Sequence, residues 1–337
     1  MKNKIWRNML IPGIFSVILV TVPTLLIKFS IIDAYTAQIL SLAGINSIMA
    51  LSVNMICGIT GQLSLGQAGF MAIGAYSSIL LTLNAGLPLP VSVILSGLIT
   101  AFFGFLIGFP TLKLEGDYLA IVTLGFGEII RVVLVNMKSL TGGPNGKQFP
   151  SILTIDSTAA FFVIISVLAV IVVLMQNFIR STYGRAILAV REDEIAANSN
   201  GIGVFRYKML GFVIASFVAG IGGALYAPFI GFIKPDMASF TYSINYLIFV
   251  VLGGMGSVTG SILSAFVLTY LQEFLRFLQN YRLLIYPVIL ILVMQFRPQG
   301  LLGMKEFSFV RTWDLLRAKH SVSTKKTKTG VNGGKNA

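Results

Sequence analysis

The chain has 337 residues, of which 55% are hydrophobic and only 11% are charged. A soluble domain carries about 25% charged residues, so these charges cannot build a surface that faces water throughout. Repeated apolar stretches of roughly 20 residues instead predict an all-α, polytopic membrane protein. The net charge of +13 would favour nucleic-acid binding in a soluble protein, but here the basic residues flank apolar runs, and no nucleic-acid partner is expected.

About ten transmembrane helices are predicted along the chain. They cover 9–27, 35–57, 62–83, 89–111, 117–136, 157–176, 209–231, 241–256, 258–277 and 282–296. The first follows a basic N-terminus without a small-residue cleavage site, so it is interpreted as an uncleaved helix. The stretch "GGMGSVTG" interrupts the eighth and ninth, which leaves open two short helices or one re-entrant pair.

The distribution of basic residues predicts the topology. With ten spans, most of the 25 basic residues lie on the same side as both termini, which is therefore expected to be cytoplasmic. The segment 304–337 is basic and poor in apolar residues, so it is expected to be a disordered tail. Contact of this tail with anionic membrane lipid is the alternative.

A glycine-rich stretch, 54–76, carries amide and hydroxyl side chains at predicted membrane depth. Such groups need hydrogen-bond partners there, and broken helices commonly form transport sites. A translocation path and tight helix packing explain the pattern equally well. The candidate path residues are Asn54, Gln62, Ser64 and Gln67.

Glu128 and Arg131 lie three residues apart within the span 117–136, on one helical face. An ionisable group in hydrocarbon costs roughly 2.5–3.5 kcal/mol on insertion scales, so such groups face a partner or a cavity. An internal ion pair that fixes helix packing is the leading interpretation. One alternative is that these residues line the substrate route. The other is that their side chains extend to the outer surface of the membrane.

Two glycine pairs hint at an internal repeat of two halves. Gly58 and Gly61 enclose two residues, as Gly253 and Gly256 do. Glycine spacing alone is a weak signal, because glycine also permits close helix contact.

A polar island at 180–208 interrupts the apolar pattern and is predicted to face the cytoplasm. Asp193 is placed to cap a short helix, Glu194 suits the positive helix start, and Asn200–Gly201 is a stop signal. A second helical stretch is expected at 182–191. So short a helix is marginal in isolation, so it is expected to pack against its own bundle or against a partner protein.

Residues typical of catalysis or nucleotide binding are missing from the sequence. The single histidine, His320, lies in the tail, and the single Cys57 rules out an intramolecular disulfide. "GGPNGKQ" at 142–148 departs from a P-loop in its glycine spacing and in the Gln148 that follows Lys147. Catalysis by this chain is therefore not expected, and neither a cofactor nor a metal is expected to bind it. Any ATP must be bound by another subunit.

Three stretches together carry a family resemblance: "GQLSLGQAGFMAIGAY", "LEGDYLAIVTLGFGEIIRVVLVNMKSLTGGPNG" and "YGRAILAVREDEIAANSNGIGVFRYKMLGFVIASFVAGIGGALYA". They resemble the LivM-type permeases of branched-chain amino acid ABC importers. The likeness covers 35–303, which is then the permease domain, with 1–34 as an added first span. It implies a type II importer permease fold in a prokaryotic cell membrane.

The resemblance also implies partners and a role for the island. The partners are a homologous second permease, two cytoplasmic ATPase subunits that bind ATP and Mg²⁺, and an extracytoplasmic binding protein. The island is similar to the family's ATPase-docking loop, EAAxxxG, except that Ile195 stands at the acidic position. The implied docking residues are Arg185, Arg191, Glu192, Asp193, Glu194, Ala196, Ala197 and Gly201.

Two alternatives in substrate and mechanism remain open. Closely similar permeases import urea, short amides or other amino acids instead of Leu, Ile and Val. A self-sufficient secondary transporter is the alternative from a different class, but it would be expected to place coupling carboxylates at mid-membrane, where Glu128 alone is available.

Overall fold

The computed structural model describes residues 33–149, 157–297, 299–301 and 303. The predicted first span, 9–27, and the basic tail lie outside this part. The helices are α2 (Ala34–Val53), η1 (Asn54–Ile59), α3 (Gln67–Leu83), α4 (Leu89–Thr111), α5 (Asp117–Asn136), α6 (Lys138–Thr141), η2 (Gly143–Asn145), α7 (Ser157–Arg180), α8 (Thr182–Glu192), α9 (Glu194–Ser199), α10 (Val204–Ile230), η4 (Pro235–Ala238), α11 (Phe240–Gly253), α12 (Val258–Phe274), η5 (Leu275–Tyr281) and α13 (Arg282–Phe296). A two-stranded sheet pairs β1 (Lys147–Gln148) with β2 (Phe232–Ile233).

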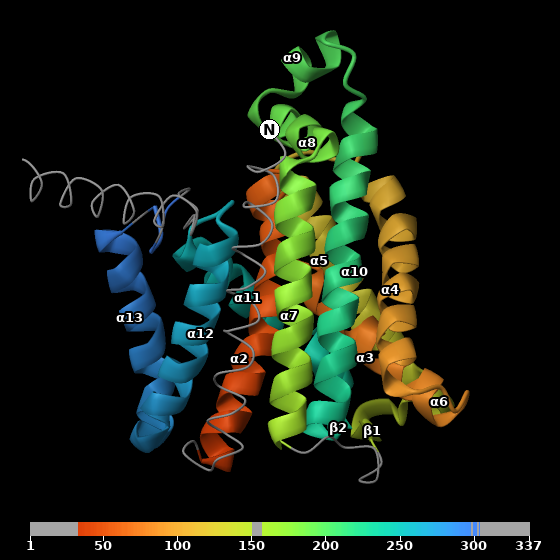
Figure 1. Ribbon diagram of the computed structural model, residues 1–337, viewed down its shortest axis with the longest axis vertical. Helices are drawn as coiled ribbons and strands as arrows, with labels where there is room; N and C mark the ends of the chain where they lie inside the picture. The colour runs from red at the N-terminus through yellow and green to blue at the C-terminus, as the bar shows by residue number, and fades with distance from the viewer. Residues whose placement is uncertain (1–32, 150–156, 298, 302, 304–337) are drawn as a thin grey trace, which may run out of the picture.

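The described chain is an all-α bundle of membrane-spanning length. Six of its helical segments are long and apolar enough to cross a bilayer, and three shorter apolar helices, α3, α11 and α13, accompany them. All nine correspond to predicted spans. The two ends of the bundle differ in character, because α8 and α9 project beyond one end whereas α6, β1 and β2 cover the other (Figure 1).

The centre of the bundle is formed by α2, α3 and α10, with α4 packed on α3 and α10, and α7 and α12 packed on α2. Glycines bring α3 and α10 into backbone contact. A Cβ atom added to Gly74 would lie 2.2 Å from the carbonyl oxygen of Gly220, and one added to Gly223 would lie 1.9 Å from that of Met71. Small residues therefore set the distance between the two central helices.

Two of the central helices are followed by a stretch without α-helix and then by a shorter α-helix. Residues 34–59, in α2 and the π-helix η1, are followed by 60–66 and then α3. Similarly α10 is followed by 231–239, which contains β2 and η4, and then by α11. Since α10 starts at the end of the bundle where α2 finishes, the two arrangements run in opposite directions (Figure 1).

The helix predicted to begin at residue 62 begins at Gln67 instead. The backbone between is held from elsewhere in the chain, since the Leu65 amide donates to the Thr123 hydroxyl at 3.1 Å. At the start of α3, the Ala68 amide donates to the Ser243 hydroxyl at 3.2 Å. Side chains of α5 and α11 thus accept hydrogen bonds from backbone amides that have no helical partner. Hydrocarbon could not provide such acceptors.

The region 241–277 is interrupted where the sequence predicts, between α11 and α12. Gly254 and Gly256 have φ angles of +102° and +91°, which side-chain-bearing residues rarely adopt. A tight turn at 254–257 therefore separates α11 from α12 and reverses the chain.

Candidate functional site

The polar island folds into two short helices outside the apolar bundle. Ser181 caps α8, since its hydroxyl accepts from the Gly184 amide at 3.2 Å. Asp193 caps α9, since its carboxylate accepts from the Ala196 amide at 2.9 Å. The predicted N-cap is confirmed.

Gly201 ends α9, as the sequence predicts. Its φ of +78° is left-handed, its amide donates to the Asn198 carbonyl at 2.9 Å, and the Ile202 amide donates to the Ala197 carbonyl at 3.1 Å. This pair of bonds is the Schellman pattern, which closes a helix and turns the chain sharply. α9 is therefore defined at both ends by local contacts.

Two basic side chains attach the island to the bundle. Lys208, in the second turn of α10, forms an ion pair of 2.5 Å with Glu194, and its side chain is only 9% exposed. The Arg191 guanidinium donates to the Gly58 carbonyl at 2.6 Å. Neither contact was predicted, because Lys208 joins α10 to α9 and the Gly58 carbonyl lies 133 residues before Arg191 in the chain.

The remaining island residues divide by exposure. Ile195 is 82% exposed, whereas Ala197 on the same short helix is buried at 5%. Ala196, Arg185, Glu192 and Asp193 are also exposed. The outer face of α9 is therefore an exposed surface with one large apolar side chain at its centre.

The amide and hydroxyl candidates gather where α2 gives way to α3, and all four are buried. The Asn54 side-chain oxygen accepts from the Gly256 amide at 2.8 Å, and that of Gln67 accepts from the Ser52 hydroxyl at 2.9 Å. Gln62 and Ser64 have no side-chain hydrogen-bond partner among the described residues. Asn54 thus serves as a clamp between two segments, while Gln62 and Ser64 retain unused hydrogen-bonding capacity inside the bundle.

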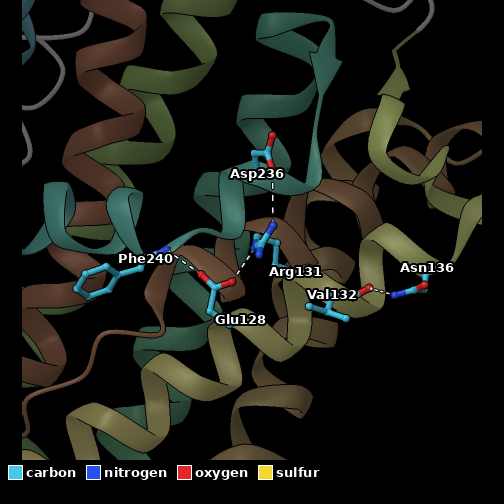
Figure 2. A network of polar contacts seen from close by, with 6 residues as sticks. All are labelled: Glu128, Arg131, Val132, Asn136, Asp236 and Phe240. Atoms are coloured by element: carbon cyan, nitrogen blue, oxygen red, sulfur yellow. Dashed lines mark hydrogen bonds and ion pairs between the residues drawn. The ribbon is translucent and has the colours of Figure 1, made fainter.

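Glu128 and Arg131 form the predicted ion pair, with 2.6 Å between carboxylate and guanidinium (Figure 2). Each side chain is 34% exposed. The second carboxylate oxygen of Glu128 accepts from the Phe240 amide at 3.3 Å, at the start of α11. Arg131 also lies 3.8 Å from the carboxylate of Asp236 in η4. The pair therefore joins α5 to the segment that re-enters the bundle before α11, a connection that the sequence does not reveal.

At the opposite end from α9, two connecting segments are joined. Lys147 pairs with Ile233, and Gln148 pairs with Phe232, in an antiparallel register. The Phe149 amide continues the pairing by donating to the Gly231 carbonyl at 2.8 Å. The segments before α7 and after α10 thus form one surface.

Groups that would hold a metal ion are missing from the part of the chain that the structure describes: no cluster of three or more His, Cys, Asp or Glu side chains occurs there. Cys57 is a free, buried thiol in η1.

Comparison with known proteins decides the family. Residues 35–294 match the family described as branched-chain amino acid transport system / permease component. This chain belongs to that permease family. The matched range contains α9, the Glu128–Arg131 pair and the α2–α3 break, so every candidate site lies within the family domain.

Individual relatives agree with this placement. The chain is 40% identical over 298 residues to the LivM permease protein of the high-affinity branched-chain amino acid transport system of Escherichia coli K12, which covers 80% of this chain and 70% of that protein. It is 24% identical to a probable LivM permease of Methanocaldococcus jannaschii, covering 80% and 93% of the two chains. It is 26% identical to the LivH permease of Salmonella typhimurium, covering 77% and 92%. No solved structure matches the chain significantly. As a member of the permease family, the chain is a multi-pass transport protein and not an enzyme.

Proposed function

We propose that this chain is the transmembrane permease subunit of an ABC importer that moves Leu, Ile and Val into the cell by ATP-driven alternating access. One observation carries the proposal: a capped helix, α9, stands outside the apolar bundle and exposes Ile195. The E. coli relative is named as a permease of a branched-chain amino acid transport system, which supplies the substrate class.

The exposed face of α9 supports docking of an ATPase subunit. An isolated helix of six residues is marginal, so two caps and two attachments to the bundle indicate that its shape matters. Ile195 is 82% exposed, and burying such a side chain against a partner contributes about 1.5–3 kcal/mol. The ATPase subunits would contact Ile195 and Ala196 of α9. They would also contact the exposed charges of Arg185, Glu192 and Asp193 beside it.

A second, homologous permease is proposed to cover α5. Of the long helices, α5 is the least buried, at 28% of its span compared with 78% for the segment containing α2. Glu128 and Arg131 are each one-third exposed on it. Charges directed at lipid are costly, so this part of α5 faces protein or a water-filled route. The substrate route is accordingly placed between the two permeases, along α5.

The amide cluster offers the second half of the proposed route. An amino acid substrate presents an ammonium and a carboxylate and an apolar side chain. Buried polar groups normally have hydrogen-bond partners, so the unused groups of Gln62 and Ser64 are available to a polar ligand when the bundle moves. In this proposal Gln62, Ser64 and Gln67 act near the α2–α3 break, while Asn54 holds that break in place.

The opposite end is proposed to receive the extracytoplasmic binding protein. The β1–β2 sheet joins the segments at 137–149 and 231–239 into one surface, on the side away from α9 (Figure 1). Both termini are proposed to lie in the cytoplasm with α9. ATP and Mg²⁺ would be bound by the ATPase subunits and not by this chain.

The experiment that tests this function is uptake of radiolabelled leucine by a strain lacking this gene, complemented with the wild-type chain. ATP-dependent uptake resistant to excess urea is expected. Uptake abolished by urea would identify the amide-transporting alternative, and uptake that persists without the ATPase subunits would identify a secondary transporter. Either result contradicts the proposal.

The docking surface is tested by Ile195→Asp, with Ser199→Asp on the same helix as the matched control. Ile195→Asp is expected to lower ATPase-subunit co-purification and uptake about tenfold or more, since an apolar contact is replaced by a charge. The control is expected to retain both, because Ser199 is already polar and exposed. Normal co-purification of the Ile195 variant would contradict docking through this face.

A further inference from the structure

Arg191 is the last basic residue of α8 and lies two residues before the cap of α9. Its side chain does not extend towards the outer face of the island. The guanidinium is half-buried and donates to the carbonyl of Gly58, 133 residues earlier in the chain, at 2.6 Å. Hydrogen bonds from a charged donor are about twice as strong as neutral ones. The acceptor also lies near the end of a helix, where carbonyls lack helical partners and cations are favoured.

A second segment meets the same place. The turn between α11 and α12 brings the Gly256 amide to 2.8 Å from the Asn54 side chain. A Cβ atom on Gly58 would lie 2.4 Å from the Gly256 nitrogen, and one on Gly256 would lie 3.3 Å from the Arg191 guanidinium. Gly58 and Gly256, one glycine of each pair that resembles a repeat in sequence, therefore meet in space, with Arg191 against them.

The contact continues along the stem of the arginine. A Cβ atom on Gly61 would lie 2.8 Å from Cγ of Arg191, and Gly61 has a φ of +72°. Glycine is required at this position for two reasons: it permits the left-handed turn after η1, and it leaves room for the arginine. We define the Arg191 junction as Asn54, Gly58, Gly61, Arg191 and Gly256.

The junction lies between the docking helix and the α2–α3 break. On one side, Arg191 is joined to α9 by one intervening residue, Glu192, and the cap Asp193. On the other side, Gly61 directly precedes Gln62, and Gly58 and Ser64 lie within four residues of Gln62. Glu194 separately ties α9 to α10 through Lys208. A displacement of α9 therefore has two routes into the bundle, and the route through Arg191 leads to the proposed path residues.

We propose that Arg191 is a positioning residue that transmits movement of α9 to the cytoplasmic ends of α2 and of the α11–α12 turn, and so couples ATPase docking to movement of the α2–α3 break. The inference rests on the proposed importer function. It separates Arg191 from the other island residues, because Arg191 acts inside the permease rather than as a contact of the ATPase.

The test compares Arg191→Gln, Arg191→Lys and the matched control Arg206→Gln in the assembled importer in proteoliposomes. Arg206 is exposed in the first turn of α10 and belongs neither to the proposed docking residues nor to the Arg191 junction. The measurement is the number of ATP molecules hydrolysed per leucine transported, together with co-purification of the ATPase subunits.

Arg191→Gln is expected to keep the ATPase subunits bound while the ratio of ATP to leucine rises about tenfold, the size expected from losing one charged hydrogen bond. Arg191→Lys is expected to raise the ratio less, since lysine keeps the charge without the planar guanidinium. The control is expected to keep the wild-type ratio. Should Arg191→Gln fail to assemble, Arg191→Lys carries the test.

An unchanged ratio in the Arg191 variants overturns the inference. Loss of ATPase co-purification in Arg191→Lys also overturns it, because Arg191 would then be a docking contact. If the wild-type complex itself shows no ATP-dependent leucine uptake, the proposed function has failed rather than the role of Arg191.

Discussion

Glu128 connects two helices that meet within the apolar bundle. Its carboxylate accepts from Arg131 on its own helix and from the Phe240 amide at the start of α11. A negative charge at a helix start is favourable, because unpaired amides and the helix dipole converge there. The residue thus has one role in neutralising Arg131 and another in holding the re-entrant segment on α5.

Replacing Glu128 by Gln is expected to lower thermal stability and uptake. Arg131 would keep only Asp236, at 3.8 Å, although the amide oxygen of Gln still accepts from Phe240. The loss should lie between the ~1 kcal/mol of an exposed pair and the ~3–5 kcal/mol of a buried one. Thermal unfolding of the purified chain measures it, with Glu115→Gln, the same change in an exposed loop, as control.

Removing the other partner completes the comparison. Arg131→Gln is expected to be equally harmful, and the double variant Glu128→Gln/Arg131→Gln less harmful than the sum, because the first change has already removed the shared contact. Strictly additive losses would show that the two side chains do not act as a pair.

Individual residues were predictable where their partners are local. The spacing of Glu128 and Arg131 predicts their contact, because residues three apart lie on one helical face. The Phe240 amide and the Lys208 ammonium belong to different helices from their partners, Glu128 and Glu194, so no pattern within a single helix identifies them. Asn54 was assigned to the path from its polarity alone, whereas its observed partner is a turn 202 residues away.

Helix ends are likewise predictable from sequence where local residues determine them, and not where distant residues do. α9 follows from sequence because Asp193 and Gly201 act within one turn of it. By contrast, the late start of α3 depends on Thr123 and Ser243, which stabilise the non-helical backbone before it. Hydrophobicity locates the span but cannot locate a break whose hydrogen bonds come from distant helices.

The contact between α3 and α10 is expected to tolerate no added side chain. In Gly223→Ala the new methyl would lie 1.9 Å from the Met71 carbonyl oxygen, which is backbone and cannot rotate away. Such overpacking costs about 1–3 kcal/mol or more. A lower melting temperature of the purified chain, or less chain in the membrane, is the expected result.

Gly125→Ala provides the control for this substitution. Gly125 is also helical, but a Cβ atom there meets nothing within 4 Å. Because alanine favours helix over glycine by about 1 kcal/mol, the isolated chain should be unchanged or more stable. Equal effects of the two substitutions would contradict the close approach of α3 and α10.

The whole molecule has two unlike ends, and its proposed mechanism depends on which side of the membrane each faces. The excess of Lys and Arg on one side predicts that the end with α9 faces the cytoplasm. The structure adds that the segments 137–149 and 231–239 join in one sheet and that α8 and α9 lie at the opposite end (Figure 1). In the proposed importer, the surface for the binding protein and the helix for the ATPase therefore lie at opposite ends of the bundle (Figure 1).

Cysteine labelling tests this orientation in intact cells. Cys57 is buried, so little labelling of the native chain is expected. Ser199 and Asn145 are exposed at opposite ends. Ser199 is a better probe than its buried neighbour Ala197. A membrane-impermeant maleimide is expected to label Asn145→Cys in intact cells and Ser199→Cys only after permeabilisation. Labelling of Ser199→Cys from outside would place α9 beyond the reach of a cytoplasmic ATPase, and neither docking nor coupling through Arg191 could then operate.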